Sequence, residues 1–250
     1  VFPELCLTGY PLEDAVFSGA ILAETERYVS KLAGVTKSQD TGMVLSVPLA
    51  KQEGGERRIY NTALFLHKGE VREIYSKVHL PNYGVFDEYR NYQPGQLEEA
   101  RPIEVQGRKL GVLICEDMWF EDVAEQLARG GAECFIAINA SPYHIRKQEA
   151  RRRMAQRIAL RHRIPLLYVN LMGAQDALIF DGGSFVLSSE GEYLSPPVCW
   201  KERTITYMLA KDRQLEPARK TSDQPLLESQ ELGAEAEYVY QALMLGVRDY

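Results

Sequence analysis

Three apolar runs of strand length occupy the middle of the chain, and each of them ends in polar residues. They are LGVLICED (110–117), ECFIAINAS (133–141) and PLLYVNLMG (165–173). Helical patterns separate them, one at 120–132 and a longer one at 145–163. Continuous apolar strands that alternate with helices are typical of a sheet buried on at least one face. The order of these segments therefore predicts an α/β layered domain.

The segments on either side extend the same pattern. Apolar positions at helical spacing predict a helix over 16–33, and glycines at tight turns predict hairpins. The other predicted elements are a strand at 43–50, hairpins at 60–77 and 182–196 that turn at Lys68-Gly69 and Glu190-Gly191, a strand–turn–strand unit at 102–117 and a last strand at 203–210. Residues 78–96 form a long loop without periodicity, and loops of this length are mostly functional or disordered.

The composition changes towards the end of the chain. Beyond the last predicted strand the residues are mostly polar and include Pro217 and Pro225, which is typical of a linker. We therefore expect one domain over 1–212, a linker over 213–230 and, in 231–250, a helix that begins another module.

Charge and cysteine usage exclude several classes of protein. The net charge of −6 provides no basic field for nucleic acid. The arginine-rich segment 145–163 is apolar at Met154, Ile158 and Ala159, so we interpret its arginines as a solvated or interface face. No run of about 18 apolar residues that could span a membrane occurs. Four scattered cysteines without C-x-x-C or Cys/His clusters predict reduced thiols in a cytoplasmic protein, with neither a metal site nor a disulfide framework.

Three residues could carry out nucleophilic chemistry if the fold brings them together. Cys115 ends an apolar strand, where α/β sheets place reacting groups, and the helix that follows favours the thiolate. Because Glu116 and Asp117 come next, a cation such as Lys77 is needed to offset their charge. Glu4 lies among apolar residues, and partial desolvation suits a carboxylate for proton transfer. Each residue also has an ordinary interpretation, as a core cysteine, a solvated lysine or a strand-end glutamate.

Several motifs resemble those of a known enzyme superfamily. FPEL (2–5), YSKVHLPNYGVFDE (75–88) and GVLICED (111–117) are similar to three signature segments of the nitrilase, or carbon-nitrogen hydrolase, superfamily. LTGYPLED, ICEDMW, NASPYH and FDGGSF resemble the glutamine amidohydrolase domain of glutamine-dependent NAD synthetases, and the tail YQALMLGVRDY resembles the helix that opens their synthetase domain. The resemblance implies an α-β-β-α sandwich with a Glu-Lys-Cys triad, here without the strand and helix that normally precede VFPEL.

The resemblance also implies a role for each matching residue. Glu4 corresponds to the general base, Lys77 to the oxyanion-stabilising cation and Cys115 to the nucleophile. Glu88 matches a supporting glutamate near the lysine. The residues expected to hold glutamine are Tyr83, Ser141 and Lys147. A lysine can pair with the α-carboxylate of glutamine, while acidic and hydroxyl groups can receive its α-ammonium.

The implied reaction is hydrolysis of the glutamine side-chain amide through a cysteine thioester. Its ammonia serves the ATP-dependent amidation of nicotinic acid adenine dinucleotide in a synthetase domain of the same polypeptide. The glutaminase step needs no cofactor, whereas ATP and Mg²⁺ belong to that synthetase domain. By the same resemblance we expect a homo-oligomer that binds glutamine, and neither nucleic acid nor a membrane.

Two alternatives stay open. A stand-alone amidase, nitrilase or carbamoylase with the same triad would turn over another small amide and would have no synthetase domain. A pseudoenzyme or interaction module would keep the sandwich for assembly and would form no thioester.

Overall fold

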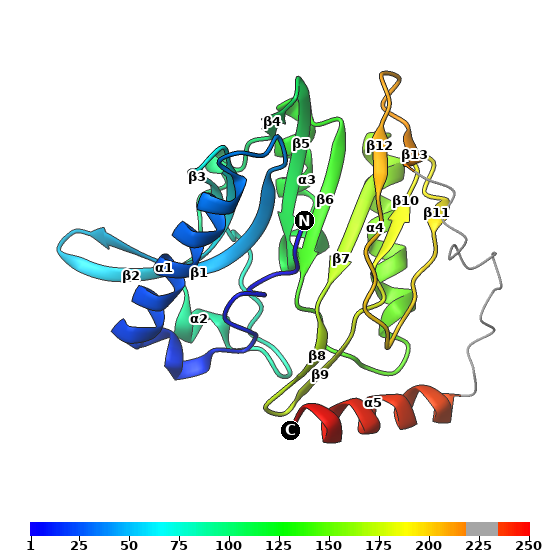
Figure 1. Ribbon diagram of the computed structural model, residues 1–250. Helices are drawn as coiled ribbons and strands as arrows, with labels where there is room; N and C mark the ends of the chain where they lie inside the picture. Colours follow the sequence, from blue (N-terminus) through cyan, green and yellow to red (C-terminus); the bar gives the residue numbers. More distant parts are fainter. Residues whose placement is uncertain (219–234) are drawn as a thin grey trace.

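The chain folds into two β-sheets that face each other, with helices on their outer faces (Figure 1). The computed structural model describes residues 1–218 and 235–250. The first sheet is antiparallel and contains β1 (Met43–Glu53), β2 (Glu56–His67) and β3 (Glu70–Ser76). Lys68 and Gly69 have φ values of 52° and 84°, as a primed two-residue turn requires. The hairpin predicted at 60–77 is thus confirmed.

The second sheet is mixed and has the strand order β11-β10-β7-β6-β5-β4. Its centre is parallel and contains β5 (Arg108–Ile114), β6 (Cys134–Asn139) and β7 (Leu166–Asn170). Parallel strands need crossover connections, and α3 (Asp122–Arg129) and α4 (Lys147–His162) supply them. The antiparallel outer strands are β4 (Ile103–Val105), β10 (Phe185–Leu187) and β11 (Tyr193–Ser195). The three central apolar runs therefore form the parallel strands.

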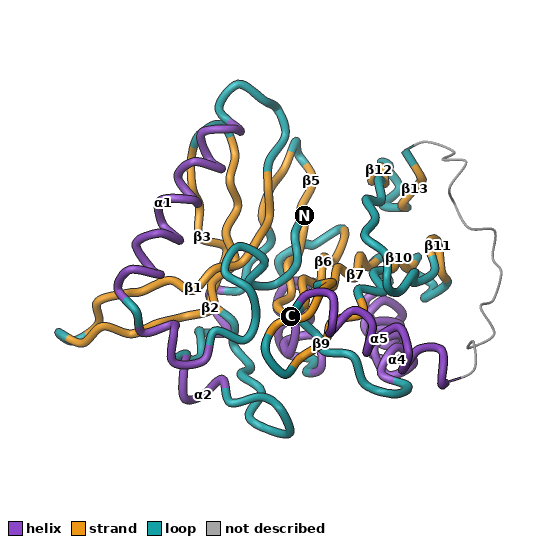
Figure 2. The backbone as a smooth tube through the Cα atoms, turned by 60° about the horizontal axis from the view of Figure 1, so that its bottom comes forward, coloured by secondary structure: helices purple, strands orange, loops and turns teal. Residues whose placement is uncertain are grey.

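Alternating side chains on β2 hold the layers together. Leu64 and Leu66 pack with Val29 and Ala33 of α1 (Gly19–Thr36). The intervening side chains point the other way, because successive strand residues face opposite sides of a sheet. Ala63 and Phe65 share a core with residues of the second sheet and its helices: Val112, Leu113, Leu127 and Ile158. The predicted α-β-β-α sandwich is confirmed, and Figure 2 shows α1 on the side of β1–β3 that faces away from β5.

A hairpin that the sequence did not predict follows β7. The single strand expected at 165–173 ends at Asn170, and the chain continues as β8 (Met172–Gln175) and β9 (Leu178–Asp181). Gly173 and the polar residues at the turn break the apolar pattern, which concealed the pairing. The helix predicted within 231–250 is α5 (Glu235–Asp249), and it contacts this hairpin (Figure 1). The N–H of Ala174 donates to the Asp249 carboxylate at 2.9 Å.

The predicted domain boundary at residue 212 needs a correction. β12 (Tyr207–Leu209) pairs antiparallel with β13 (Leu215–Pro217), so part of the predicted linker belongs to a strand pair. A proline is tolerated there because β13 lies at the edge of a two-stranded ribbon. The portion of the linker at 219–230 lies outside the described residues.

Short helical segments lie in the connections between these elements. They are the 3-10 helices η1 (Glu13–Phe17), η2 (Leu97–Glu99) and η3 (Cys115–Trp119), and the α-helix α2 (Glu88–Asn91). α2 lies within the predicted irregular loop 78–96 and places Glu88 at its first turn. Across residues 1–218 and 235–250, no helix is long and apolar enough to cross a membrane.

The packing of β2 against α1 predicts a large stability difference between two cross-strand neighbours. Leu66 is fully buried, whereas Val71, its partner on β3, is 45% exposed. We expect Leu66→Ala to lower the free energy of unfolding by about 2–5 kcal/mol because it leaves a cavity under α1. Val71→Ala should lower it by less than about 1 kcal/mol. Urea denaturation of both variants measures the difference, and equal losses would contradict the sandwich.

Candidate active site

The residues that could carry chemistry gather where the two sheets meet, at the carboxyl ends of the parallel strands. Cys115 follows β5, Ala140 follows β6, and Asn170 ends β7. From the facing sheet, Asn61 lies in β2 and Lys77 follows β3. The carboxyl ends of parallel strands are where α/β proteins bind ligands. Asn61 and Lys77, from the first sheet, thus lie on the other side of the site from the ends of the parallel strands.

Cys115 occupies an abrupt turn between β5 and η3. Its φ is +45°, which non-glycine residues seldom adopt and which is found at functional sites where the fold enforces it. Its side chain is almost fully buried. Burial raises the pKa of the Cys115 thiol well above its ordinary value, and Glu4 raises it further while Lys77 opposes the shift. The sulfur is therefore a neutral thiol at neutral pH, contrary to the expected thiolate, and it needs a base to react.

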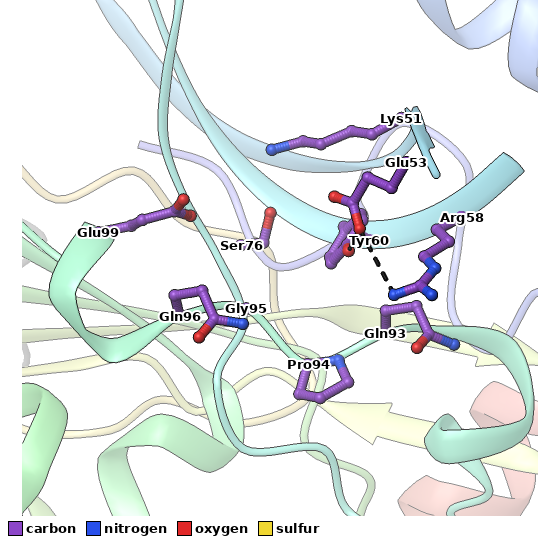
Figure 3. A pocket seen from close by; sticks show the side chains of 10 residues that line it. All are labelled: Lys51, Glu53, Arg58, Tyr60, Ser76, Gln93, Pro94, Gly95, Gln96 and Glu99. Carbon is purple, nitrogen blue, oxygen red and sulfur yellow. Dashed lines mark hydrogen bonds and ion pairs between the residues drawn. The ribbon is translucent and has the colours of Figure 1, made fainter. Parts of the chain in front are cut away.

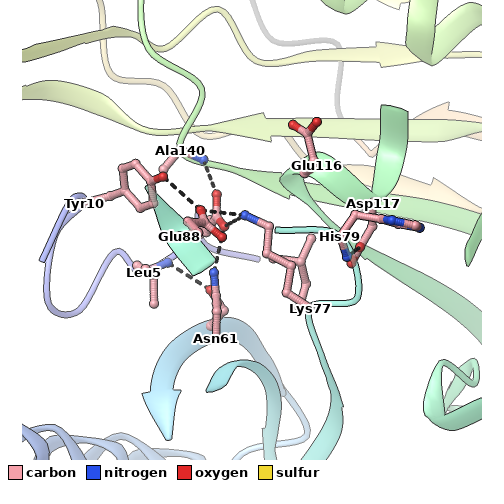
Figure 4. A network of polar contacts seen from close by, with 12 residues as sticks. Leu5, Tyr10, Asn61, Lys77, His79, Glu88, Glu116, Asp117 and Ala140 are labelled. Atoms are coloured by element: carbon pink, nitrogen blue, oxygen red, sulfur yellow. Dashed lines mark hydrogen bonds and ion pairs between the residues drawn. The ribbon is translucent and has the colours of Figure 1, made fainter. Parts of the chain in front are cut away.

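The Glu4 carboxylate is fully buried and is held by three donors. Its Oε1 accepts hydrogen bonds from Lys77 Nζ and Asn61 Nδ2, both at 2.8 Å. Its Oε2 accepts the N–H of Ala140 at 2.9 Å. In Figure 4, Lys77, Asn61 and Ala140 converge on this position from different parts of the fold. Because a carboxylate has about four acceptor positions, Glu4 can still take a proton without losing its anchors.

The Lys77 ammonium is fully buried between two carboxylates. Its Nζ lies 2.8 Å from Oε1 of Glu4 and 2.8 Å from Oε1 of Glu88. Burial alone would lower the pKa of Lys77, but the two carboxylates outweigh it and hold the pKa well above its ordinary value. The main chain is also anchored, because Lys77 N–H donates to Asn61 O and Gly95 N–H donates to Lys77 O, each at 2.8 Å. Lys77 is therefore a fixed cation.

Glu88 is the second carboxylate on Lys77. It also accepts the phenol O–H of Tyr10 at 2.8 Å (Figure 4). Burial raises the pKa of Glu88 to about 7. The Lys77 ammonium opposes this shift, and the Glu4 carboxylate adds to it. Burial likewise raises the pKa of Tyr10, so its phenol remains a donor. One ammonium thus binds two buried carboxylates, and the pKa of Glu88 lies near neutral pH.

The two carboxylates that follow Cys115 have different partners. Asp117 is fully buried and accepts the N–H groups of Val78 and His79 at 3.1 and 2.8 Å, together with the phenol of Tyr75 at 2.8 Å. It therefore anchors the segment that follows Lys77, and burial raises its pKa to about 6. Although carboxylates are frequent here, no group of three or more potential metal ligands comes together within the described parts of the chain.

Glu116, by contrast, belongs to a set of polar groups around the thiol. The phenol of Tyr83 donates to its two oxygens at 3.1 and 3.0 Å. The ammonium of Lys147, at the start of α4, lies 4.7 Å from the centre of the Trp119 ring. Burial and the Arg151 cation lower the pKa of Lys147, while Glu116, and Cys115 when it is ionised, act in the opposite direction. The Cys115 thiol thus has an anion and a cation within electrostatic reach.

Ser141, the third residue expected to hold glutamine, bonds to the protein itself. It is 6% exposed, and its Oγ accepts the Nε–H of Arg151 at 3.1 Å. Arg151 is an exception to the interpretation of the 145–163 arginines as a solvated or interface face, because it is fully buried within this chain. The sequence contained a signal for this: Arg151 lies four residues before Ala155 and seven before Ile158, so it shares their buried face. Tyr10 and Asn61 carried no comparable signal.

A cavity of about 220 Å³ lies beside the site, between the β1–β2 hairpin and the segment 93–99 (Figure 3). Glu53 and Arg58, both of this hairpin, line it on one side, and Arg58 Nη1 lies 3.6 Å from Glu53 Oε2. Gly95 forms part of its wall, where a Cβ would lie 2.0 Å from the Ser76 carbonyl oxygen. None of the described residues that line it is a cysteine or a histidine. We therefore interpret it as a surface recess beside the segment that anchors Lys77.

Comparison with known proteins identifies the family of this chain. A family model described as carbon-nitrogen hydrolase matches residues 1–218. The chain belongs to the carbon-nitrogen hydrolase family. A solved structure with the same fold is an amidase of Nesterenkonia AN1 from the nitrilase superfamily, which is similar to this hydrolase at 26% identity and a TM-score of 0.63. The match covers 78% of this chain and 71% of the amidase.

Other relatives of this hydrolase match it over its whole length. The glutamine-dependent NAD(+) synthetase of Aquifex aeolicus is 35% identical over 273 residues, which cover 100% of this chain and 47% of the relative. The solved structure of the glutamine-dependent NAD+ synthetase from Acinetobacter baumannii, in complex with ADP, is 32% identical with a TM-score of 0.83. It covers 100% of this chain, which in turn covers 44% of it. The hydrolase therefore spans about half the length of these relatives.

The raised pKa of Glu88 predicts a specific pH dependence of stability. A carboxyl that binds its proton more tightly when folded stabilises the protein below its unfolded pKa, and that stabilisation is lost as pH rises through its folded pKa of about 7. Glu88→Gln removes this contribution. The fall in the free energy of unfolding between pH 5 and pH 8 should therefore be smaller in the variant by on the order of 2 kcal/mol. Urea denaturation at both pH values tests this, and parallel pH profiles would contradict it.

Proposed function

We propose that this carbon-nitrogen hydrolase cleaves the side-chain amide of glutamine through a thioester on Cys115. The observation that carries the proposal is the buried contact of Glu4 with Lys77, at 2.8 Å, within electrostatic reach of the Cys115 sulfur. A base, a cation and a nucleophile are the groups that acyl transfer of this kind needs. Glutamine as the amide is supported by the relatives, which are glutamine-dependent NAD(+) synthetases.

In the first step, Glu4 accepts the thiol proton while the sulfur of Cys115 bonds to the amide carbon. The carbonyl electron pair moves onto oxygen and forms a tetrahedral oxyanion. Lys77 has three N–H donors, of which two bond to Glu4 and Glu88. The third donates to the oxyanion, together with a backbone N–H near the thiol. One such donor contributes about 3 kcal/mol to stabilisation of the transition state.

In the following steps, protonated Glu4 transfers its proton to the amide nitrogen, and the C–N bond breaks. Ammonia leaves, and the glutamyl group remains on Cys115 as a thioester. A water molecule then gives a proton to Glu4 while its oxygen attacks the thioester carbon. Glu4 returns the proton to sulfur as glutamate departs. Glutamine and water are consumed, and glutamate and ammonia are formed.

The charged groups around the thiol fit the amino-acid end of glutamine. Lys147 would pair with the α-carboxylate, and Glu116 would receive the α-ammonium. Tyr83 supports this role because its phenol holds the Glu116 carboxylate at 3.0 Å. Ser141 contributes from the segment after β6, where its hydroxyl is oriented by Arg151. These roles deepen the sequence-based assignment, which did not include Glu116.

The ammonia would serve the ATP-dependent amidation of nicotinic acid adenine dinucleotide, in a synthetase domain of the same polypeptide. The names of the relatives and the fact that this chain spans about half of each support this. The glutaminase step requires no cofactor, whereas ATP and Mg²⁺ belong to the second reaction. By analogy with the family, we also propose a cytoplasmic homo-oligomer.

A stand-alone amidase is the second candidate, because an amidase of the nitrilase superfamily shares the fold. Glu116 and Lys147 favour the main proposal, since a simple amide offers no charges for them to bind. An assembly module without catalysis is disfavoured by the Glu4–Lys77–Glu88 cluster. Three buried charges are costly to desolvate, and an apolar core would serve assembly equally well.

Labelling with 6-diazo-5-oxo-norleucine, a reactive glutamine analogue, tests the nucleophile. We expect the full chain to gain one adduct on Cys115, located by mass spectrometry, and to lose glutamine hydrolysis in parallel. Cys115→Ala should neither react nor hydrolyse glutamine, because no thioester can form. Cys134→Ala, which removes a different free cysteine, should behave like the parent. An adduct on another residue, or none in a folded protein, would overturn the proposal.

Substrate recognition is tested by Glu116→Gln and Lys147→Met. Each variant removes one charge that binds the amino-acid end of glutamine but leaves the triad intact. We expect the KM for glutamine to rise at least tenfold, by the roughly 1.4 kcal/mol of one charged contact, with kcat changed less than about threefold. Glu149→Gln, an exposed charge on the same helix, is the control and should match the parent. An unchanged KM in both variants contradicts these roles.

A further inference from the structure

Arg151 is a fully buried cation that the proposed reaction does not use directly. It belongs to α4, and its exposed fraction is 0%. A buried charge without partners is strongly destabilising, so its contacts decide what it does. Its Nη1 donates to both oxygens of Asp181 at 2.8 and 3.0 Å, and Asp181 is itself buried at the end of β9. Asp181 therefore neutralises the charge of Arg151 but accepts hydrogen bonds from only one of its three nitrogens.

The remaining donors of Arg151 bind the segment Ala140–Pro142, which follows β6. Its Nε donates to Ser141 Oγ at 3.1 Å, and its Nη2 donates to the carbonyl oxygens of Ser141 and Pro142 at 2.6 and 2.9 Å. The planar guanidinium therefore binds three acceptors of two consecutive residues. A lysine could not reproduce this pattern, because its donors radiate from one atom.

The same segment holds the proposed general base. The N–H of Ala140, the residue before Ser141, donates to Oε2 of Glu4 at 2.9 Å. Asn170 supports the segment from the other side, since its Oδ1 accepts the Ser141 N–H at 2.9 Å. The peptide that orients Glu4 is thus held on its C-terminal side by Arg151 and Asn170. The contact with Glu4 and the first contacts with the guanidinium are therefore made by adjacent residues, Ala140 and Ser141.

We infer that Arg151, paired with Asp181, is a positioning residue for amide hydrolysis: it holds Ala140–Pro142 so that the Ala140 N–H fixes Glu4 against Cys115. This inference rests on the proposed function, because it assigns Glu4 the role of base. Arg151 itself touches neither sulfur nor substrate. A displacement of about 1 Å at a catalytic group costs on the order of 100-fold in rate.

The test separates positioning from mere structural support. Removing one partner of a buried pair leaves an unpaired charge, whereas replacing both with apolar residues is often neutral for stability. The informative variant of the full chain is therefore Arg151→Met with Asp181→Leu. The matched control is Arg153→Met with Glu149→Leu, because this exposed pair lies on the same helix at 3.3 Å. Arg151→Lys keeps the charge on Asp181 but loses the planar contacts.

We expect the double variant to keep the melting temperature of the control and to lose on the order of 100-fold in kcat for glutamine. The KM should change less than about threefold, because Lys147 and Glu116 stay in place. Its crystal structure should show the Ala140 N–H displaced from Glu4. Arg151→Lys should have a kcat between those of the double variant and the control. If the double variant does not fold, the kcat and crystal structure of Arg151→Lys test the inference instead. A kcat within threefold of the control, or a loss with Ala140 unmoved, overturns the inference.

A second measurement tests the positioning role of Arg151 without depending on which substrate the protein hydrolyses. Alkylation of Cys115 by iodoacetamide at pH 7 depends on a base for the thiol but not on glutamine. We expect its rate to fall at least tenfold in the double variant and to be unchanged in the control. If the parent fails to hydrolyse glutamine but this difference appears, the proposed substrate is wrong and the positioning role stands. An equal alkylation rate in the parent, the double variant and the control overturns the positioning role.

Discussion

The ammonium of Lys77, buried between Glu4 and Glu88, is the interaction on which the rest of the site depends. Two buried carboxylates would repel each other without it, and neither could remain ionised away from water. The three groups come from the N-terminal segment, the end of β3 and the start of α2. The cluster therefore forms only when these segments are packed together. Closing the sandwich and assembling the catalytic charges are one event.

Backbone conformation contributes as much to the site as side-chain charge does. Glu4 is placed by main-chain contacts on both sides, since Phe2 N–H donates to Val44 O and Leu5 N–H to Ser46 Oγ, each at 2.9 Å. Leu5 and Cys115 both have positive φ values, 49° and 45°. The proposed base and nucleophile thus lie at abrupt turns, where the chain leaves the direction of β1 or β5. Such conformations persist only where the surrounding fold enforces them.

The sequence predicted those parts of the fold that depend on local pattern. The Lys-Gly turn between two segments of strand length identifies the β2–β3 hairpin, because neighbouring residues alone decide it. The motifs similarly indicated Glu4, Lys77 and Cys115, although only the fold places them together. Hydrogen-bond partners were less predictable, because Asn61 and Ala140 lie 57 and 136 residues from Glu4 in the chain. The strand pair β8–β9 was missed because its side chains lack alternation.

Arg151 shows how composition can mislead. In a helix with many arginines, one buried guanidinium looks like its solvated neighbours, and only its position relative to Ala155 and Ile158 distinguishes it. Burial of such a group is acceptable only where acceptors converge from several segments. Here they come from β9 and from the residues after β6. The helical position of Arg151 therefore indicates the buried face, whereas the acceptors that compensate its charge come from long-range structure.

The charges in the closed site also explain why the sulfur rests as a thiol. When Glu88 is ionised, two carboxylates and one ammonium already leave the cluster with an excess negative charge. A thiolate would add another, and burial together with Glu4 accordingly raises the pKa of Cys115. In the proposed reaction, the proton would therefore leave sulfur only as the amide carbon is attacked, and Glu4 would become neutral as it accepts that proton. Negative charge then appears on the oxyanion, so that Lys77 exchanges one anionic partner for another. Because the thiolate is also the form that oxidises, the same arrangement protects the nucleophile between turnovers.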